Sequence, residues 1–100
     1  MTDTLKLVLT DHWFEEIKSG RKTHEYRKVT PFWTKRLGAE TTLCLAHTYK
    51  VNRVQFQKAY RKNAEKMTFE IKDILVRFGT NTDLKCPEPV FDIELGERIK

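Results

Sequence analysis

The sequence lacks long apolar runs, and this shortage excludes one class of protein at once. Its uninterrupted apolar stretches are only a few residues long, whereas a helix that crosses a bilayer needs about 20. The first residues, Met1–Thr4, have neither the charged nor the apolar region of a secretory signal. We therefore expect a cytoplasmic protein with no membrane partner.

Cysteine is also scarce, and its placement argues against a zinc site. Cys44 lies in the apolar run Leu43–Ala46, and Cys86 precedes Pro87 in a loop-like stretch. Neither belongs to a CxxC pair or has a pair of histidines nearby. We expect two reduced thiols, with Cys44 buried and Cys86 on the surface.

Several signatures of catalysis and ion binding are missing. The chain has no Gly-rich phosphate loop, no GxSxG nucleophile motif and no DxDxDG calcium loop. Its histidines, His12, His24 and His47, are scattered without metal-ligand spacing. The sequence therefore predicts no metal and no cofactor.

Positive charge and aromatic side chains are plentiful. Nineteen Lys and Arg residues against fourteen Asp and Glu residues give a formal net charge of +5, which favours encounter with polyanions such as RNA, DNA or nucleotides. Six Phe, three Tyr and two Trp residues can bury enough apolar surface for a stable core in 100 residues. We expect one domain over residues 1–100; the sequence leaves its oligomeric state open, and we favour a monomer.

Hydrophobic spacing predicts about six strands and two short helices. The apolar set of the longest strand changes phase near Lys72 and Asp73, which indicates a β-bulge and turns Ile74, Val76 and Phe78 inward. Trp13, Phe14, Phe32 and Trp33 have helical spacing and are expected in the core. The predicted strands are residues 5–9, 23–28, 42–46, 53–57, 67–78 and 90–95, and the predicted helices are residues 11–19 and 31–37.

This order of elements predicts an α+β chain whose sheet curls into a small mixed β-barrel, with both helices in the N-terminal half. Periodicity alone does not show whether such a barrel closes.

The most informative segment runs from Gly20 to Arg27, because charged side chains crowd a predicted strand where a helix ends. In an extended segment Glu25 and Arg27 share one face, and His24 and Tyr26 share the other. A Glu–Arg pair at this spacing neutralises itself and can hold a rigid fork of donors for a phosphate or a base edge. Lys22 would stand at the rim.

The spacing Gly20-x-Lys22-x-x-Glu25-x-Arg27 resembles the G-x-K-x-x-E-x-R signature of ASCH domains, which are PUA-like barrels. Residues 13–19, 31–37 and 91–97 are also similar to the short, stand-alone members of bacteria and their phages, so the resemblance covers nearly the whole chain. It implies a cleft between barrel and helix, with Lys22, Glu25 and Arg27 at its base, that holds RNA or a nucleotide.

The resemblance leaves enzymatic alternatives open. One bacterial branch is implied to be an amidohydrolase of acylated cytidine that uses the motif lysine as nucleophile and a threonine where this chain has Glu25. Other members are implied to be ribonucleases. If this chain is a hydrolase, Lys22 and Glu25 are its catalytic candidates. An amine attacks only when uncharged, so a direct contact between Glu25 and Lys22 would favour binding over catalysis.

A third alternative is a phage-type protein-interaction module that inhibits a host factor.

A second basic segment, residues 58–66, places Tyr60 next to Arg61. Single-strand binders combine aromatic rings for stacking with cations for phosphate, although a solvated loop would have the same composition. The predicted nucleic-acid-binding residues are therefore Lys22, Glu25, Tyr26, Arg27, Tyr60 and Arg61.

Overall fold

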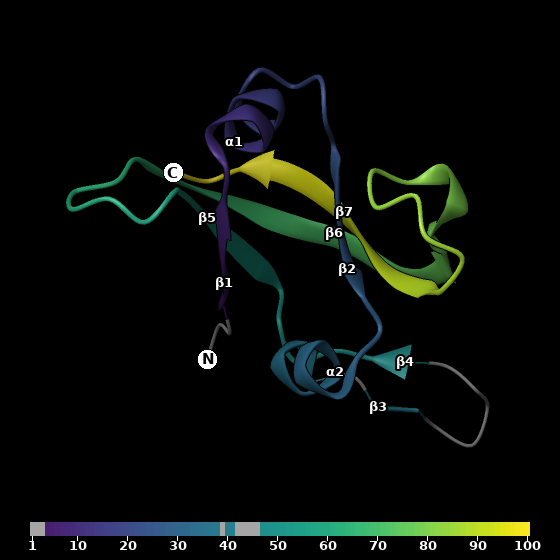
Figure 1. Cartoon of the computed structure of the whole chain (residues 1–100). Helices are drawn as coiled ribbons and strands as arrows, with labels where there is room; N and C mark the ends of the chain where they lie inside the picture. Colours follow the sequence, from purple (N-terminus) through teal and green to yellow (C-terminus); the bar gives the residue numbers. More distant parts are fainter. Residues whose placement is uncertain (1–3, 39, 42–46) are drawn as a thin grey trace.

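A computed structural model describes residues 4–38, 40–41 and 47–100 of the chain (Figure 1). The expected strand at residues 42–46, and Cys44 with it, lie outside the described residues. In chain order the elements are β1 (Thr4–Leu9), α1 (Asp11–Lys18), β2 (His24–Lys28), α2 (Pro31–Leu37), β3 (Glu40–Thr41), β4 (His47–Thr48), β5 (Arg53–Lys58), β6 (Lys66–Phe78), the 3-10 turn η1 (Gly79–Asn81) and β7 (Pro89–Arg98).

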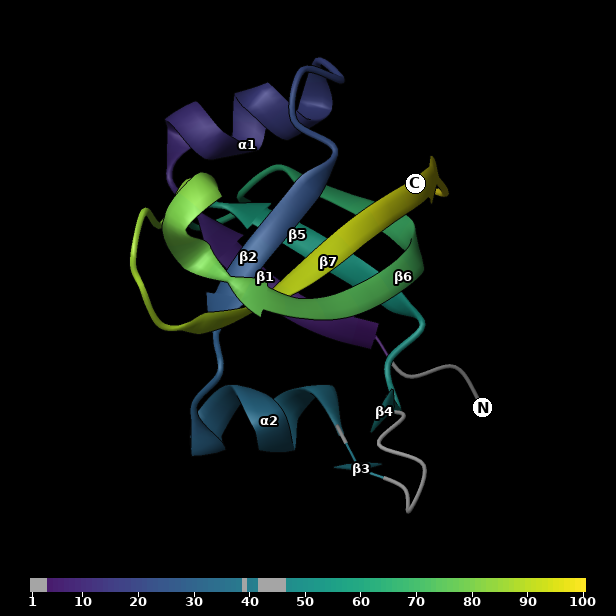
Figure 2. The ribbon, with the colours of Figure 1, turned by 90° about the vertical axis from the view of Figure 1, so that its right-hand side faces the viewer.

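Five strands form one curled sheet in the order β1-β5-β6-β7-β2. β1 runs parallel to β5, and the other neighbours are antiparallel. The sheet bends into a half-barrel between α1 and α2, as Figure 2 shows. The strands β3 and β4 form a separate antiparallel pair. The expected α+β class and the two helices are confirmed, but a closed barrel of six strands is not what the described residues form, because β1 and β2 are the two edges of the five-stranded sheet.

The core fills the concave side of this half-barrel. α1 contributes Phe14 and Ile17, and α2 contributes Leu37 at the opposite end. Each buried side chain of this size stabilises the fold by about 1.5–3 kcal/mol. The strands supply the other buried residues of this cluster, which are Leu5, Leu7, Leu9, Val54, Phe56, Met67, Ile74, Phe91 and Ile93.

Local sequence explains where both helices end. Gly20, with φ of +85°, follows α1, and Gly38, with φ of +65°, follows α2. Glycine adopts this left-handed conformation without the cost that a Cβ imposes. α2 begins with Pro31 after Thr30, whose hydroxyl accepts a hydrogen bond from the Trp33 amide at 3.3 Å.

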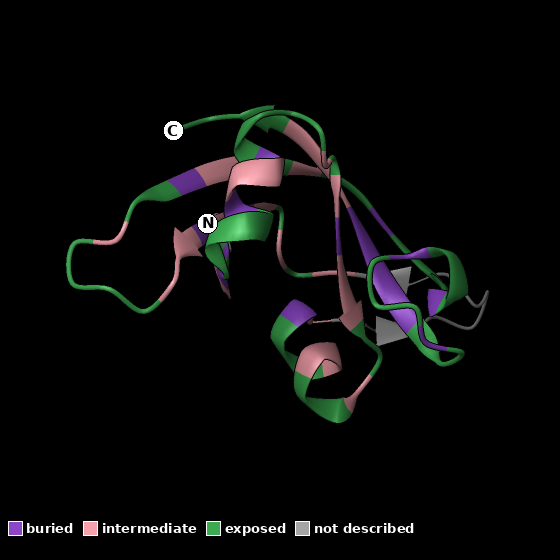
Figure 3. Cartoon of the chain, turned by 45° about the horizontal axis from the view of Figure 1, so that its top comes forward, coloured by how far each residue is buried: buried purple, intermediate pink, exposed green. Residues whose placement is uncertain are grey.

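The bulge in β6 is confirmed, since its register against β7 shifts between Phe69 and Asp73. The burial expected for Val76 and Phe78 is wrong: both are exposed, because they lie in the part of β6 beyond Glu70, where β5 no longer pairs with β6. In Figure 3 the exposed residues, in green, include most of the loop between β5 and β6 and much of the loop between β6 and β7.

Two further expectations about burial are corrected. Cys86 is buried, not on the surface, since the loop between β6 and β7 folds its thiol against Gly79. Of the four helical aromatics, Phe14 is fully buried, whereas Trp13 is 36% exposed and Phe32 is 58% exposed. Trp33 is partly buried against the core.

None of the helices in the described part of the chain has the length and apolar character needed to span a bilayer.

Candidate functional site

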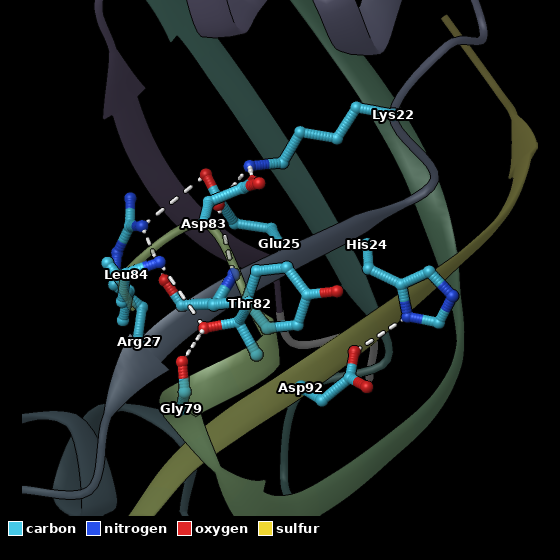
Figure 4. Close-up of polar contacts among 10 residues, drawn as sticks. Lys22, His24, Glu25, Arg27, Gly79, Thr82, Asp83, Leu84 and Asp92 are labelled. Atoms are coloured by element: carbon cyan, nitrogen blue, oxygen red, sulfur yellow. Dashed lines mark hydrogen bonds and ion pairs between the residues drawn. The ribbon is translucent and has the colours of Figure 1, made fainter. Parts of the chain in front are cut away.

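Glu25 is a buried carboxylate held between two cations (Figure 4). Its Oε1 lies 3.2 Å from Nζ of Lys22, and its Oε2 lies 3.4 Å from Nη1 of Arg27. The side chains of Lys22 and Arg27 are only 11% and 20% exposed, so the three charges share a sheltered environment. The structure therefore brings the three motif residues together.

The side chains of Glu25 and Arg27 also cover the free edge of β2. Thr23 and Val29 form backbone hydrogen bonds with Leu95 and Pro89, so the alternation of an antiparallel pair directs the backbone of Tyr26 away from β7. The Tyr26 amide donates to Glu25 Oε1 at 2.9 Å, and its carbonyl accepts from Arg27 Nη1 at 2.9 Å. Both side chains are thus fixed by the edge that they cover, and the edge is protected from pairing with another strand.

Asp83 joins this cluster from the loop between β6 and β7, and sequence reasoning missed it. Its Oδ2 contacts Nζ of Lys22, which lies 61 positions earlier in the chain. The turn after Phe78 positions it: the Thr82 hydroxyl donates to the Gly79 carbonyl at 2.8 Å and accepts from the Leu84 amide at 3.3 Å. Only the turn-rich composition of residues 79–89 hinted that this loop could fold back.

The cluster opens on a hollow of about 230 Å³ between the edge strands β1 and β2, named here the Glu25 hollow. Trp13 forms one wall, and Nζ of Lys22 lies 4.3 Å from the centre of its ring. Two cations and two carboxylates face this space, so their charges compensate each other. The lining residues are Val8, Leu9, Thr10, Trp13, Lys22, Glu25, Tyr26, Arg27, Asp83 and Leu84.

A second hollow of about 330 Å³, named the Arg36 hollow, adjoins the first on the α2 side. The two share Val8 and Arg27. Cζ of Arg27 lies 5.2 Å from the centre of the Trp33 ring, which places the guanidinium against an aromatic face. The lining residues are Lys6, Leu7, Val8, Arg27, Phe32, Trp33, Arg36 and Tyr60.

A third hollow of about 340 Å³ lies on the other side of Lys22 and contains His24 and Tyr26. Nδ1 of His24 lies 2.6 Å from Oδ1 of the buried Asp92, and Oδ2 of Asp92 also forms an ion pair with Nε of Arg77 at 2.9 Å. Burial, followed by the nearby charges of Asp92 and Asp83, raises the pKa of Tyr26, so its phenol stays neutral at physiological pH. A larger hollow of about 590 Å³ beside α2 contains none of the predicted site residues.

The predicted residues of the basic loop are placed apart from the Glu25 hollow. Tyr60 is 89% exposed and lines the Arg36 hollow. Arg61 instead pairs with Asp11 of α1 at 2.7 Å. Sequence reasoning also missed Trp13, Trp33, Phe32 and Arg36 as lining residues, although the aromatic spacing of both helices had singled out three of them.

Across the described side chains, no three His, Cys, Asp or Glu residues lie close enough together to hold a metal ion. No protein-family model matches the chain, and no curated protein is similar enough in sequence to count as a relative.

Proposed function

We propose that the chain binds single-stranded RNA or a modified nucleotide, with a base in the Glu25 hollow. The resemblance of Gly20–Arg27 to the ASCH signature points to this class of ligand. The observation that carries the proposal is the buried Glu25 carboxylate, fixed between Lys22 and Arg27 at the edge of a hollow.

The charge balance of this hollow favours a base over a phosphate. Because Glu25 and Asp83 offset Lys22 and Arg27, the site presents both donors and acceptors rather than net positive charge. The polar edge of a nucleobase also carries both: arginine pairs with acceptors such as those of guanine, and carboxylates accept from exocyclic amino groups. Trp13 adds an aromatic wall for stacking.

A binding titration with short single-stranded RNA tests this proposal. Lys22→Ala and Arg27→Ala remove donors that face the hollow, so each is expected to weaken binding by about tenfold while the protein stays folded. Lys72→Ala is the matched control, because Lys72 lies on β6 with an exposed side chain and should leave the affinity unchanged. Equal affinities for all four proteins, or no binding at all, would contradict the proposal.

The hydrolase alternative is less well supported by the geometry. Nζ of Lys22 contacts two carboxylates, Glu25 and Asp83, and these contacts suit a charged ammonium rather than an attacking amine. Turnover of acetylcytidine that disappears in Lys22→Ala would nevertheless establish it.

One observation favours the protein-interaction alternative. Val76 and Phe78 are exposed apolar side chains on one face of the end of β6, and exposed apolar surfaces serve as contact sites for proteins. Co-purification of one host protein that is lost in Phe78→Ala, together with absence of RNA binding, would favour this alternative over nucleic-acid binding.

A further inference from the structure

The Arg36 hollow extends the proposed base-binding site along β1 and differs from it in charge. We infer that the chain holds a single-stranded segment of at least two nucleotides, with one base in the Glu25 hollow and a neighbouring nucleotide in the Arg36 hollow. This inference rests on the proposed function and narrows it, because a free mononucleotide would then fill only half of the surface.

Continuity between the two hollows is the first observation. They meet at Arg27, whose side chain lines both. Together they follow β1 from Lys6 to Thr10, which is four steps of about 3.3 Å, or about 13 Å. This length exceeds what one nucleotide needs and suits a strand that lies across both.

Charge is the second observation. The Arg36 hollow is lined by Lys6, Arg27 and Arg36, and no carboxylate is among its lining residues. Neither Lys6 nor Arg36 makes an ion pair with any acidic side chain that the structure describes; the guanidinium of Arg36 donates to the Lys6 carbonyl at 3.3 Å. Arg27 is compensated by Glu25, so Lys6 and Arg36 supply the uncompensated positive charge of the Arg36 hollow. The two hollows thus suit the two tasks of a strand binder, since phosphate needs net positive charge and a base edge needs matched donors and acceptors.

Aromatic exposure is the third observation. Phe32 is 58% exposed and Tyr60 is 89% exposed, although burying rings of this size would stabilise the fold. They come from α2 and from the loop after β5, and both line the Arg36 hollow with Trp33. Single-strand binders use such rings as stacking platforms beside cations.

The test compares ligands of two lengths, the four nucleoside 5′-monophosphates and the four matching RNA homotrinucleotides. For the unmodified protein, at least one trinucleotide is expected to bind about tenfold more tightly than its monophosphate, because stacking in the second hollow adds to the first contact.

Phe32→Ala and Arg36→Ala then probe the second hollow. Each is expected to reduce trinucleotide affinity by about tenfold and to leave monophosphate affinity unchanged. Arg36→Ala should also reduce the slope of log affinity against log salt by about 0.7, the share of one phosphate contact on a single strand. Phe78→Ala and Arg98→Ala are matched controls, since Phe78 is 70% exposed at the far end of β6 and Arg98 is exposed at the end of β7.

The outcomes separate the two proposals. If monophosphates bind but trinucleotides bind no more tightly, or if Phe32→Ala and Arg36→Ala behave like their controls, the inference fails and the proposed function stands. If neither ligand binds, both fail.

Discussion

At the scale of single residues, Glu25 has two tasks that depend on the same contacts. Its carboxylate contacts Lys22 and Arg27 at the edge of the Glu25 hollow. It also accepts a hydrogen bond from the Tyr26 amide at the free edge of β2. A buried carboxylate without cations would be costly, so the three side chains are stable only as a group. The site is therefore part of what holds β2 in place.

Removing the charge of Glu25 should consequently destabilise the fold. Glu25→Gln keeps the shape of the side chain and its acceptor oxygen but leaves Lys22 and Arg27 without their shared partner. We expect the free energy of unfolding, measured by urea denaturation, to fall by about 2 kcal/mol.

Glu70→Gln is the control for this variant, because Glu70 is exposed on β6. Its expected effect is within about 0.5 kcal/mol of zero. Equal stability of the Glu25 and Glu70 variants would show that the Glu25 contacts contribute little to folding.

At the scale of elements, the loop after β5 is attached to α1 rather than free in solvent. In the loop, Glu65 pairs with Lys18 at 2.6 Å and Arg61 pairs with Asp11 at 2.7 Å. Lys58, the last residue of β5, pairs with Glu15 at 2.9 Å. Hydrogen bonds from Arg61 and Lys58 lower the pKa of Asp11 and of Glu15 respectively. The loop that carries Tyr60 is thus positioned by charges on the helix beside it.

These pairs make the attachment dependent on pH. Because folding lowers both pKa values, the contribution of these carboxylates to stability is complete above the usual values of 3.8 for Asp11 and 4.5 for Glu15, and it is lost as pH falls through the lower values of the folded state. NMR titration of the side-chain carboxyls should therefore give midpoints below these usual values. In Arg61→Ala the midpoint of Asp11 should return toward 3.8; if it does not move, the pairing with Arg61 does not exist in solution.

Most elements could be predicted from local sequence, and the failures have a physical cause. β1, α1, β2, α2 and β5 follow the alternation, caps and glycines of their own residues. The exposure of Val76 and Phe78 could not be predicted, because alternation tells which residues share a face but not where along a strand the core ends. The burial of Cys86 depends on a fold of its loop that no local pattern indicates.

At the scale of the whole molecule, the candidate site lies where the five-stranded sheet of the described residues leaves its two edge strands, β1 and β2, unpaired with each other. β1 and β2 are edges of one sheet, and α1 and α2 lie at the two ends of the space between them (Figure 1). The hollows lie along this space, so the residues that face them come from elements distant in sequence. The proposed binding of a strand therefore depends on the openness of the half-barrel.

This dependence on topology also explains how much of the site could be predicted. Lys22, Glu25 and Arg27 are close in sequence and share a strand and its approach, so a motif identifies them. Asp83 and Arg36 reach the same surface only through the curl of the sheet and the return of a loop, which single-sequence patterns do not encode. The expected stacking role of Tyr60 remains a prediction, although Tyr60 lines the Arg36 hollow together with Phe32, which agrees with that role.

The chain contains two tryptophans, and one lies in each hollow: Trp13 in the Glu25 hollow and Trp33 in the Arg36 hollow. An NMR titration that follows their indole N–H signals with an RNA trinucleotide tests the central claim most directly. We predict that both indole signals shift together with the backbone amides of residues 22–28, whereas a monophosphate shifts only that of Trp13. Shifts confined to the exposed end of β6 around Phe78, or no shifts at all, would contradict the claim that this open edge of the half-barrel binds nucleic acid.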